Sequence, residues 1–346
     1  MIYHSSILKV LLILILVLAF GCSVRSPLNK EKHLKNLRQL TFGGENAEAY
    51  FSFDGKHLIF QATRDGHLCD QIFTMETTGK NITQISTGKG RTTCAYFLKD
   101  GVHFVYASTH LGNELCPAKP DYSKGYVWPV YPDYDIFLSD FQKQLTQLTN
   151  TSGYDAEATV SPDGKKIVFT SVRDGDLELY SMNLDGSEVQ RLTNKVGYDG
   201  GGFFSPNGKK IVFRAFYPIN KEEIARYQTL LAQHLVEPKT LEIFVIDSTG
   251  NNQVQVTNNG AANFCPFFHP DGNRIIFSSN LADPEGRNFD LYLVNIDGTQ
   301  LEQITFDKTF DGFPMFSPDG KQLVFSSNRN GKVRGETNIF IADWVD

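Results

Sequence analysis

The feature that most constrains the fold is a ten-residue motif that occurs six times along the 346 residues of the chain. In each copy, two apolar runs flank an Asp-Gly or Asn-Gly pair, which is the strongest short-range signal for a β-hairpin. The copies are FSFDGKHLIF (51–60), FLKDGVHFVY (97–106), VSPDGKKIVF (160–169), FSPNGKKIVF (204–213), FHPDGNRIIF (268–277) and FSPDGKQLVF (316–325). Successive turn residues are 46, 63, 44, 64 and 48 positions apart, so one structural unit is repeated along the chain.

Two more apolar segments follow each hairpin in most copies, and the second of them ends in Leu-Thr or Val-Thr. Four short strands in about 44 residues are typical of a propeller blade. The last copy lacks a fourth strand, whereas LRQLTF (37–42) is an unpaired strand of this type near the start of the chain. Pairing the two closes the ring and removes two exposed sheet edges. We therefore predict an all-β, six-bladed β-propeller over residues 37–346, with four antiparallel strands per blade.

These repeats resemble the TolB-like, WD40-like (PD40) β-propeller family, whose hallmarks are SPDGK, then Ile-x-Phe, and then an IY or IF strand. The resemblance covers residues 37–346 and implies the propeller fold. It implies less about function, because the same repeats are a scaffold for several activities. TolB-like propellers are associated with peptidoglycan-associated complexes, so the resemblance implies an envelope protein as partner. TolB itself carries an additional N-terminal domain, whose partner contacts do not carry over to this chain.

The beginning of the chain has the composition of an export signal. Residues 10–20 (VLLILILVLAF) are all apolar and follow Lys9, a length that fits a secretory signal and is short for a membrane span. The LAFGC end resembles a bacterial lipoprotein signal, which implies cleavage after residues 1–21, lipid attachment at Cys22 and a linker over 22–36. We expect an exported lipoprotein on the periplasmic side of the outer membrane. The alternatives are a periplasmic protein and an uncleaved N-terminal anchor.

Cysteine positions suggest one disulfide, because an oxidising compartment permits such bonds. Cys94 and Cys265 occupy equivalent repeat positions in opposite blades, which favours packing over bonding. Cys69 and Cys116 fall on one face of the ring in adjacent blades. We predict a Cys69–Cys116 disulfide.

A polar residue stands eight positions before every turn residue, where the innermost strand of each blade begins. These strand-start residues are Asn46, Thr92, Asp155, Asp199, Asn263 and Asp311. We expect them to form a collar around one mouth of the central channel, where they either bond their own backbone or bind a cation or polar ligand. Asp155, Asp199 and Asp311 are the candidate ligands of a divalent cation; no other cofactor is expected.

Two carboxylates stand six positions before the turn, and they are less scaffold-like because the other four copies lack them. Glu48 and Glu157 occupy this position in copies 1 and 3. Asp155 and Glu157 are two residues apart on one strand, so we expect their side chains to share a face. Glu157 lies between the two insertions described next and is the preferred ligand candidate.

Copies 2 and 4 carry long insertions on the same face as the collar, at 110–133 and 216–240. The first is rich in proline and aromatic residues; Tyr126 and Trp128 either contact a partner or pack on their own blade. The second predicts a helix near 221–236 that starts with a capping box at Asn220 and ends before Pro238. Long ordered loops on a rigid scaffold are often functional.

His110 and Arg173 end second strands beside these insertions and are further site candidates, although a structural role for the arginine is the alternative. The chain has no G-x-S-x-G or H-E-x-x-H motif, and its net charge of −6 without basic runs excludes a nucleic-acid footprint. We therefore favour a non-catalytic binding propeller that engages an envelope protein through the insertions. A small molecule or glycan is a possible ligand. The alternative is a channel-mouth enzyme, or an accessory propeller of a hydrolase, that acts on polysaccharide or peptide.

Overall fold

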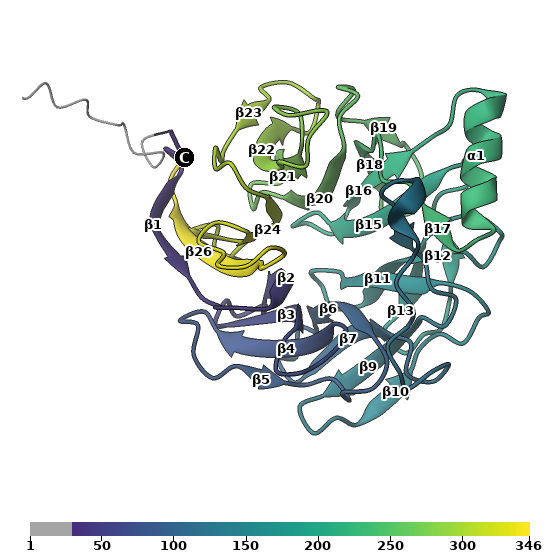
Figure 1. Ribbon diagram of the computed structural model, residues 1–346, viewed down its shortest axis with the longest axis horizontal. Coiled ribbons are helices and arrows are strands. Elements are labelled where there is room, and N and C mark those ends of the chain that lie inside the picture. Colours follow the sequence, from purple (N-terminus) through teal and green to yellow (C-terminus); the bar gives the residue numbers. More distant parts are fainter. Residues whose placement is uncertain (1–29) are drawn as a thin grey trace, which may run out of the picture.

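The six repeats form the six blades of a β-propeller, as predicted, in a computed structural model that describes residues 30–346. Figure 1 shows six twisted sheets arranged around a central axis. The predicted signal peptide and Cys22 lie outside the described residues.

Blades 1 to 3 each take their four strands from one continuous stretch of chain. Blade 1 contains β2 (Glu45–Phe51), β3 (His57–Thr63), β4 (Gln71–Glu76) and β5 (Thr83–Gln84). Blade 2 contains β6 (Thr92–Phe97), β7 (His103–Ser108), β9 (Asp135–Asp140) and β10 (Leu145–Gln147). Blade 3 contains β11 (Asp155–Val160), β12 (Lys166–Ser171), β13 (Glu178–Asn183) and β14 (Gln190–Arg191).

Blades 4 and 5 follow the same plan, and blade 6 is completed by a strand from the other end of the chain. Blade 4 contains β15 (Tyr198–Phe204), β16 (Lys210–Phe216), β18 (Glu242–Asp247) and β19 (Val254–Gln255). Blade 5 contains β20 (Asn263–Phe268), β21 (Arg274–Ser279), β22 (Asp290–Asn295) and β23 (Glu302–Gln303). Blade 6 contains β24 (Asp311–Phe316), β25 (Gln322–Ser327), β26 (Asn338–Trp344) and β1 (Leu34–Gln39).

The closing strand β1 starts earlier than the sequence suggested. It runs antiparallel to β26 from Leu34, opposite Trp344, to Gln39, opposite Phe340. Before it, Glu31 is buried and pairs with the guanidinium of Arg329 at 3.2 Å. The end of the predicted 22–36 linker therefore belongs to the propeller, because these residues have buried partners in blade 6.

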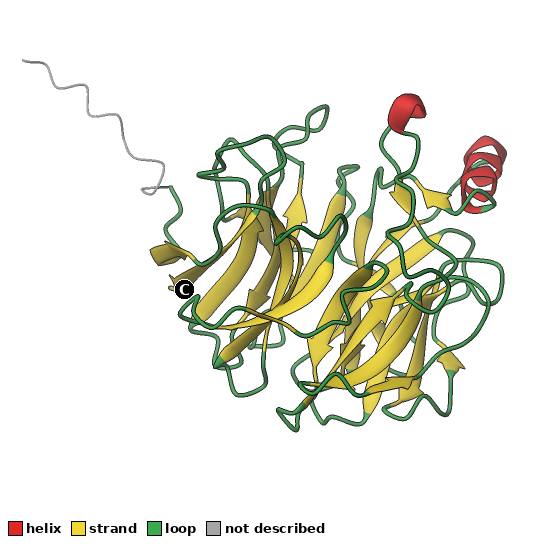
Figure 2. Cartoon of the chain, turned by 60° about the horizontal axis from the view of Figure 1, so that its bottom comes forward, coloured by secondary structure: helices red, strands yellow, loops and turns green. Residues whose placement is uncertain are grey.

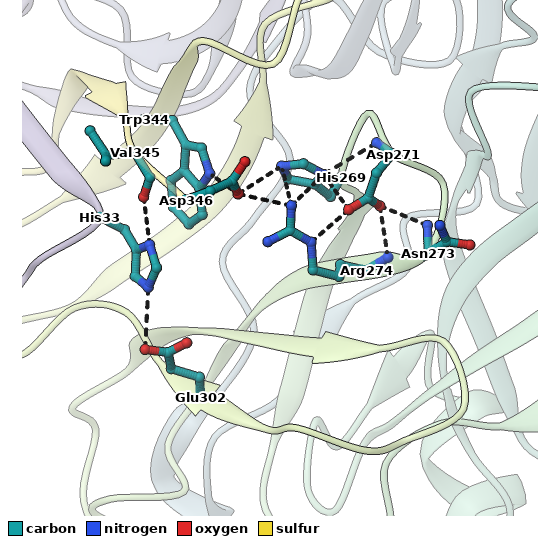
Figure 3. Close-up of polar contacts among 9 residues, drawn as sticks. All are labelled: His33, His269, Asp271, Asn273, Arg274, Glu302, Trp344, Val345 and Asp346. Atoms are coloured by element: carbon teal, nitrogen blue, oxygen red, sulfur yellow. Dashed lines mark hydrogen bonds and ion pairs between the residues drawn. The ribbon is translucent and has the colours of Figure 1, made fainter.

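Side chains from both ends of the described chain meet beside this closure (Figure 3). The His33 ring contacts the Val345 carbonyl oxygen at 2.6 Å through Nδ1 and a Glu302 oxygen at 3.2 Å through Nε2. Nearby, Arg274 forms an ion pair with Asp346 at 2.9 Å. Closure therefore rests on side-chain contacts as well as on the β1–β26 ladder.

The Ile-x-Phe pattern of the motif supplies the core of each blade. Its aromatic residue on the second strand is fully buried in all six copies. Each contacts an aromatic residue on the third strand, with ring centroids 5.8–6.2 Å apart. The pairs are Phe60–Phe73, Tyr106–Phe137, Phe169–Tyr180, Phe213–Phe244, Phe277–Tyr292 and Phe325–Phe340. Such pairs contribute about 0.5–1.5 kcal/mol each beyond the burial of their area.

The two insertions pair with each other across blade 3. The first contains a 3₁₀ turn (Tyr122–Lys124) and β8 (Trp128–Pro129); the second contains α1 (Lys221–Leu231) and β17 (Leu235–Val236). Strands β8 and β17 are antiparallel neighbours, with Trp128 opposite Val236. Figure 2 shows both helices above the strands, on one side of the disc, which we call the insertion face.

Helix α1 is shorter than the predicted 221–236. Asn220 caps its start by accepting a hydrogen bond from the Glu223 N–H at 2.9 Å, as the capping box predicts. The helix ends at Leu231 because His234 has a positive φ of 58° and the following residues join β17. Pairing with the other insertion therefore replaces the last predicted turn of helix.

Candidate functional site

A cavity of about 1090 Å³ lies on the propeller axis beneath the two insertions. Its walls come from the innermost strands of the blades and from both insertions, including Tyr126 and Trp128. Large concave sites of this kind are the default place to look for a bound ligand.

The innermost strands present six structurally equivalent residues to this cavity. In each strand the pairing register shifts by one residue, which is a β-bulge, and the bulge residue has a positive φ of 51–63°. The bulge residues are Glu48, Cys94, Glu157, Gly201, Cys265 and Phe313. For a residue other than glycine, this backbone region costs roughly 1–2 kcal/mol.

The strand-start residues do not form the predicted collar around the channel mouth. All six are buried, with at most 1% of each residue exposed, and none lines the cavity. Each donates its backbone N–H, at 2.8–3.0 Å, to the carbonyl that precedes the third strand of the preceding blade. The six pairs are Asn46–Thr337, Thr92–Asp70, Asp155–Tyr134, Asp199–Leu177, Asn263–Leu241 and Asp311–Phe289. These residues connect neighbouring blades.

The three aspartates proposed as metal ligands have separate protein partners instead. Asp155 binds Arg173 at 3.1 Å, Asp311 binds Arg329 at 2.6 Å, and Asp199 accepts a hydrogen bond from a tyrosine hydroxyl at 2.5 Å. Among residues 30–346, no three His, Cys, Asp or Glu side chains are grouped to hold a metal ion. The residues present therefore do not fit a divalent-cation site at the strand starts.

The other two candidates beside the insertions also lie outside the cavity walls. Arg173, besides its ion pair with Asp155, stacks on the rings of Phe169 and Tyr180, both at 5.0 Å. His110 contacts the Ser108 hydroxyl at 2.8 Å, and burial lowers its pKa. These contacts support the structural role for Arg173 and not a role in ligand binding.

Glu157 does reach the cavity, although Asp155 does not share its face. The left-handed conformation at Glu157 breaks the simple alternation of the strand. Its carboxylate forms an ion pair with Arg214 and accepts hydrogen bonds from the Thr170 hydroxyl at 2.7 Å and the Gly201 N–H at 2.9 Å. Glu157 is thus held by three donors.

Arg214 is the residue of this site that sequence reasoning missed. It stands on the second strand of blade 4, where other blades carry smaller residues such as Thr170 or Ser278. A Cβ atom on Gly201 would lie 1.9 Å from a terminal nitrogen of Arg214, so glycine at this bulge makes room for the guanidinium. The unusual GGG run opposite an arginine is the signal that could have identified it.

Glu48 is a bulge residue of the cavity whose carboxylate forms no ion pair with any residue that the structure describes. Its carboxylate contacts the Tyr50 hydroxyl at 3.4 Å and the Cys94 thiol. Burial and the neighbouring negative charge of Glu157 raise the pKa of Glu48 to about 7. Near neutral pH this group is therefore partly protonated, and such raised pKa values are common at functional sites.

Two chemically different walls rise from this floor. One is apolar: Phe264 lies at the centre of an aromatic cluster, with ring centroids 4.9–6.3 Å away. Its neighbours in this cluster are Trp128, Phe289, Phe310 and Phe313. The other wall carries hydroxyl groups, from Tyr131, Tyr134, Tyr154 and Tyr198.

The disulfide that the sequence predicts is present between Cys69 and Cys116. It joins the loop before β4 to the first insertion, so the insertion is covalently tied to blade 1. Cys94 and Cys265 are free thiols at bulge positions. In the part of the chain that the structure describes, no helix is long and apolar enough to cross a membrane.

The fold and its axial cavity define a six-bladed β-propeller with an insertion-covered central site. The sequence pattern of the family described as TolB beta propeller domain matches residues 132–233 and 229–341. The chain belongs to this family.

Solved structures of similar fold include two TolB proteins and one enzyme. A protein assigned as TolB from Agrobacterium tumefaciens has a TM-score of 0.59 and 18% identity, covering 89% of this chain and 94% of that one. TolB from Acinetobacter baumannii has a TM-score of 0.55 and 18% identity, covering 87% and 64%. Oligogalacturonate lyase from Vibrio parahaemolyticus has a TM-score of 0.53 and 14% identity, covering 89% and 93%. At these identities the likeness shows the fold alone.

Proposed function

We propose that this chain is a non-catalytic binding propeller of the bacterial cell envelope, which engages a protein partner through its insertion face. The observation that carries the proposal is the cavity beneath the insertions, whose wall includes Tyr126 and Trp128. A partner segment that entered it would bury aromatic surface of the kind that dominates binding energies.

Exposed apolar side chains on the same face support a protein partner. Leu68, Leu115 and Ile219 are 82%, 73% and 88% exposed in loops between second and third strands. Two of them stand next to the disulfide cysteines, so the bond holds them in fixed positions. Apolar residues presented on ordered loops are typical of interaction surfaces.

Export fits the disulfide, because such bonds persist in oxidising compartments and are rare in the cytosol. We place the protein on the periplasmic side of the outer membrane, anchored through lipid at Cys22. Labelling with a radioactive fatty acid tests this, with Cys22→Ser as control. Label that persists in the variant, or never appears in the native chain, would contradict lipid attachment.

The docking proposal is tested by affinity capture from detergent-solubilised envelopes. Whole protein is compared with a Tyr126→Ala/Trp128→Ala double variant, which removes the aromatic part of the insertion and keeps the disulfide. The control is Phe141→Ala, an exposed aromatic change in the β9–β10 hairpin on the opposite face. We expect partner recovery to fall at least tenfold for the double variant only, since truncated hot spots cost about 2 kcal/mol. Equal recovery by all three proteins would contradict the proposal.

A second candidate function is an enzyme that acts on polysaccharide at the cavity floor. The observation in its favour is Glu48, whose pKa of about 7 suits proton transfer near neutral pH. Oligogalacturonate is the first substrate to test, because a lyase for it shares the fold. Shortening of this substrate by the native chain and not by Glu48→Gln would favour the enzyme, and no shortening would favour the binding module.

A further inference from the structure

The floor of the cavity contains more negative than positive charge. At the bulge positions and on the adjoining second strand of blade 4 it carries two carboxylates, Glu48 and Glu157, and one guanidinium, that of Arg214. The rest of the cavity is lined by three further acidic residues and three cations: Glu45, Asp70 and Glu285, and Arg91, Lys239 and Arg287. The charge of Arg214 is already paired with Glu157. Its guanidinium also donates to the Tyr198 hydroxyl at 2.5 Å and packs against the Trp128 ring at 5.3 Å. One carboxylate, that of Glu48, is therefore left without a cation.

No lysine, arginine or histidine among the described residues forms an ion pair with Glu48. The groups whose charges or dipoles act on this floor come from five blades: Tyr50, Asp70, Cys94, Glu157, Arg214 and Cys265. All but Arg214 are neutral or acidic. Without a ligand, Glu48 accommodates its position by taking up a proton; a bound cation would replace that proton.

The apolar wall of the cavity favours a ligand that has a hydrocarbon part as well as a charge. Phe313 is itself a bulge residue, and its ring lies 5.9 Å from that of Phe264. A hydrocarbon stem lying on these rings would be removed from water, and that favours binding. The faces of phenyl rings also attract a cation at close range.

We propose that the cavity binds a primary alkylammonium group on an apolar stem, with the ammonium at Glu48 and the stem along the phenylalanine cluster. This inference deepens the proposed binding function and rests on it. A lysine side chain of the partner and a free aliphatic amine share this chemistry. A carboxylate is disfavoured at this position, because it would meet Glu48 and Glu157 while Arg214, the cation beside them, is already paired. Hexanoate is included in the test below because Arg91, Lys239 and Arg287 line other parts of the cavity.

The test measures binding of three six-carbon probes to the full chain by calorimetry: n-hexylammonium, n-hexanol and hexanoate. At pH 8 we expect hexylammonium to bind at least tenfold more tightly than hexanol, since a hydrogen bond between charged groups is stronger than one made by a neutral hydroxyl. Its affinity should fall about tenfold from pH 8 to pH 6, because Glu48 takes up a proton in that range. Equal affinity for the amine and the alcohol would overturn the proposal.

Glu48→Gln is the decisive variant, because it keeps the size of the side chain and removes its charge. We expect it to abolish both the preference for the amine and the pH dependence, with hexanol affinity unchanged. The matched control is Glu285→Gln, an exposed carboxylate at the rim of the same cavity. If Glu48→Gln retains the preference, or Glu285→Gln loses it, the ammonium site is not at Glu48.

A second pair of probes separates the two sources of the ammonium group. A short lysine peptide and its acetyl-lysine counterpart are compared with hexylammonium. Tighter binding of the lysine peptide than of both other probes indicates a partner side chain, whereas a preference for hexylammonium indicates a free amine. Hexanol binding without any amine preference would overturn the ammonium inference while leaving the binding cavity intact. Loss of partner capture by the aromatic double variant, measured separately, tests the proposed function.

Discussion

Two positions on each innermost strand, only two residues apart, behave in opposite ways. The strand-start residues are polar in all six blades, are buried, and bond the preceding blade. The bulge residues range from glycine to phenylalanine and all line the cavity. Repetition of one residue type around the ring therefore marks the scaffold, and variation at an equivalent position marks the place where a site can be built.

At the bulge positions the backbone conformation is shared by all six blades, whereas the side chains differ. The bulge and its left-handed conformation occur in every blade, so they belong to the fold and not to one ligand. What differs is the side chain: a carboxylate without an ion pair among the described residues in blade 1, a carboxylate paired with arginine in blade 3, and glycine beside an arginine in blade 4. The scaffold fixes where these groups point, and the sequence decides their chemistry.

We expect the largest loss of stability from the substitution of a strand-start residue. Asp311→Ala removes the carboxylate that lies 2.6 Å from the buried guanidinium of Arg329, which keeps its ion pair with Glu31 at 3.2 Å. Removing one partner of a buried ion pair typically costs about 3–5 kcal/mol. We therefore expect a loss at the lower end of the range for a buried ion pair. Urea unfolding of the variant and the native chain measures the free energy of unfolding.

The control for this change is Glu285→Ala, an exposed carboxylate for which we expect a change within about 0.5 kcal/mol. A loss below about 1 kcal/mol for Asp311→Ala would mean that the strand-start residues do not hold the blades together. The strand-start residues would then differ from the bulge residues in position but not in structural importance.

The next effect is the pH dependence that Glu48 contributes. Its pKa is raised to about 7, so between about pH 4.5 and 7 the folded chain binds this proton more tightly than the unfolded chain. Stability from this group is present at low pH and is lost as the pH rises through 7. Glu48→Gln should therefore gain about 2 kcal/mol relative to the native chain at pH 8, and little at pH 5.

The measurement is urea unfolding of both proteins at pH 5 and pH 8, and only the difference between them reports on Glu48. Asp290, with a pKa raised to about 7, adds a slope of the same sign to both proteins. A difference that is equal at the two pH values would show that Glu48 titrates normally in the folded chain.

The propeller fold could be predicted from the sequence because the same hairpin motif occurs six times. Six hairpin motifs, a missing last strand and a spare first one determine the blade number and the closure, and the Cys69–Cys116 disulfide follows from the faces that the loops share. The β8–β17 pairing was not predictable, because strands of two residues have no periodicity to detect.

The residues of the cavity were harder to predict from the sequence than the fold, because side chains no longer alternate between the two faces of a strand at a bulge. Asp155 and Glu157 were expected on one face, but the extra residue in the inner strand turns Glu157 into the cavity and leaves Asp155 between blades. A bulge of this type has no sequence signature here, since its residue varies from blade to blade. The strand-start position looked functional only because buried hydrogen-bonding residues and metal ligands are drawn from the same polar types.

The smallest effect separates backbone strain from charge at the bulge. Asparagine tolerates the left-handed region better than glutamine does, and both remove the charge of Glu48, whose φ is 52°. Glu48→Asn should therefore be more stable than Glu48→Gln by about 0.5–1 kcal/mol in urea unfolding at one pH. The same two substitutions at Glu285, which does not have a positive φ, should show no advantage for asparagine. An equal advantage at both positions would indicate that the bulge conformation stores no strain, and the difference between the two positions of the strand would then be one of chemistry alone.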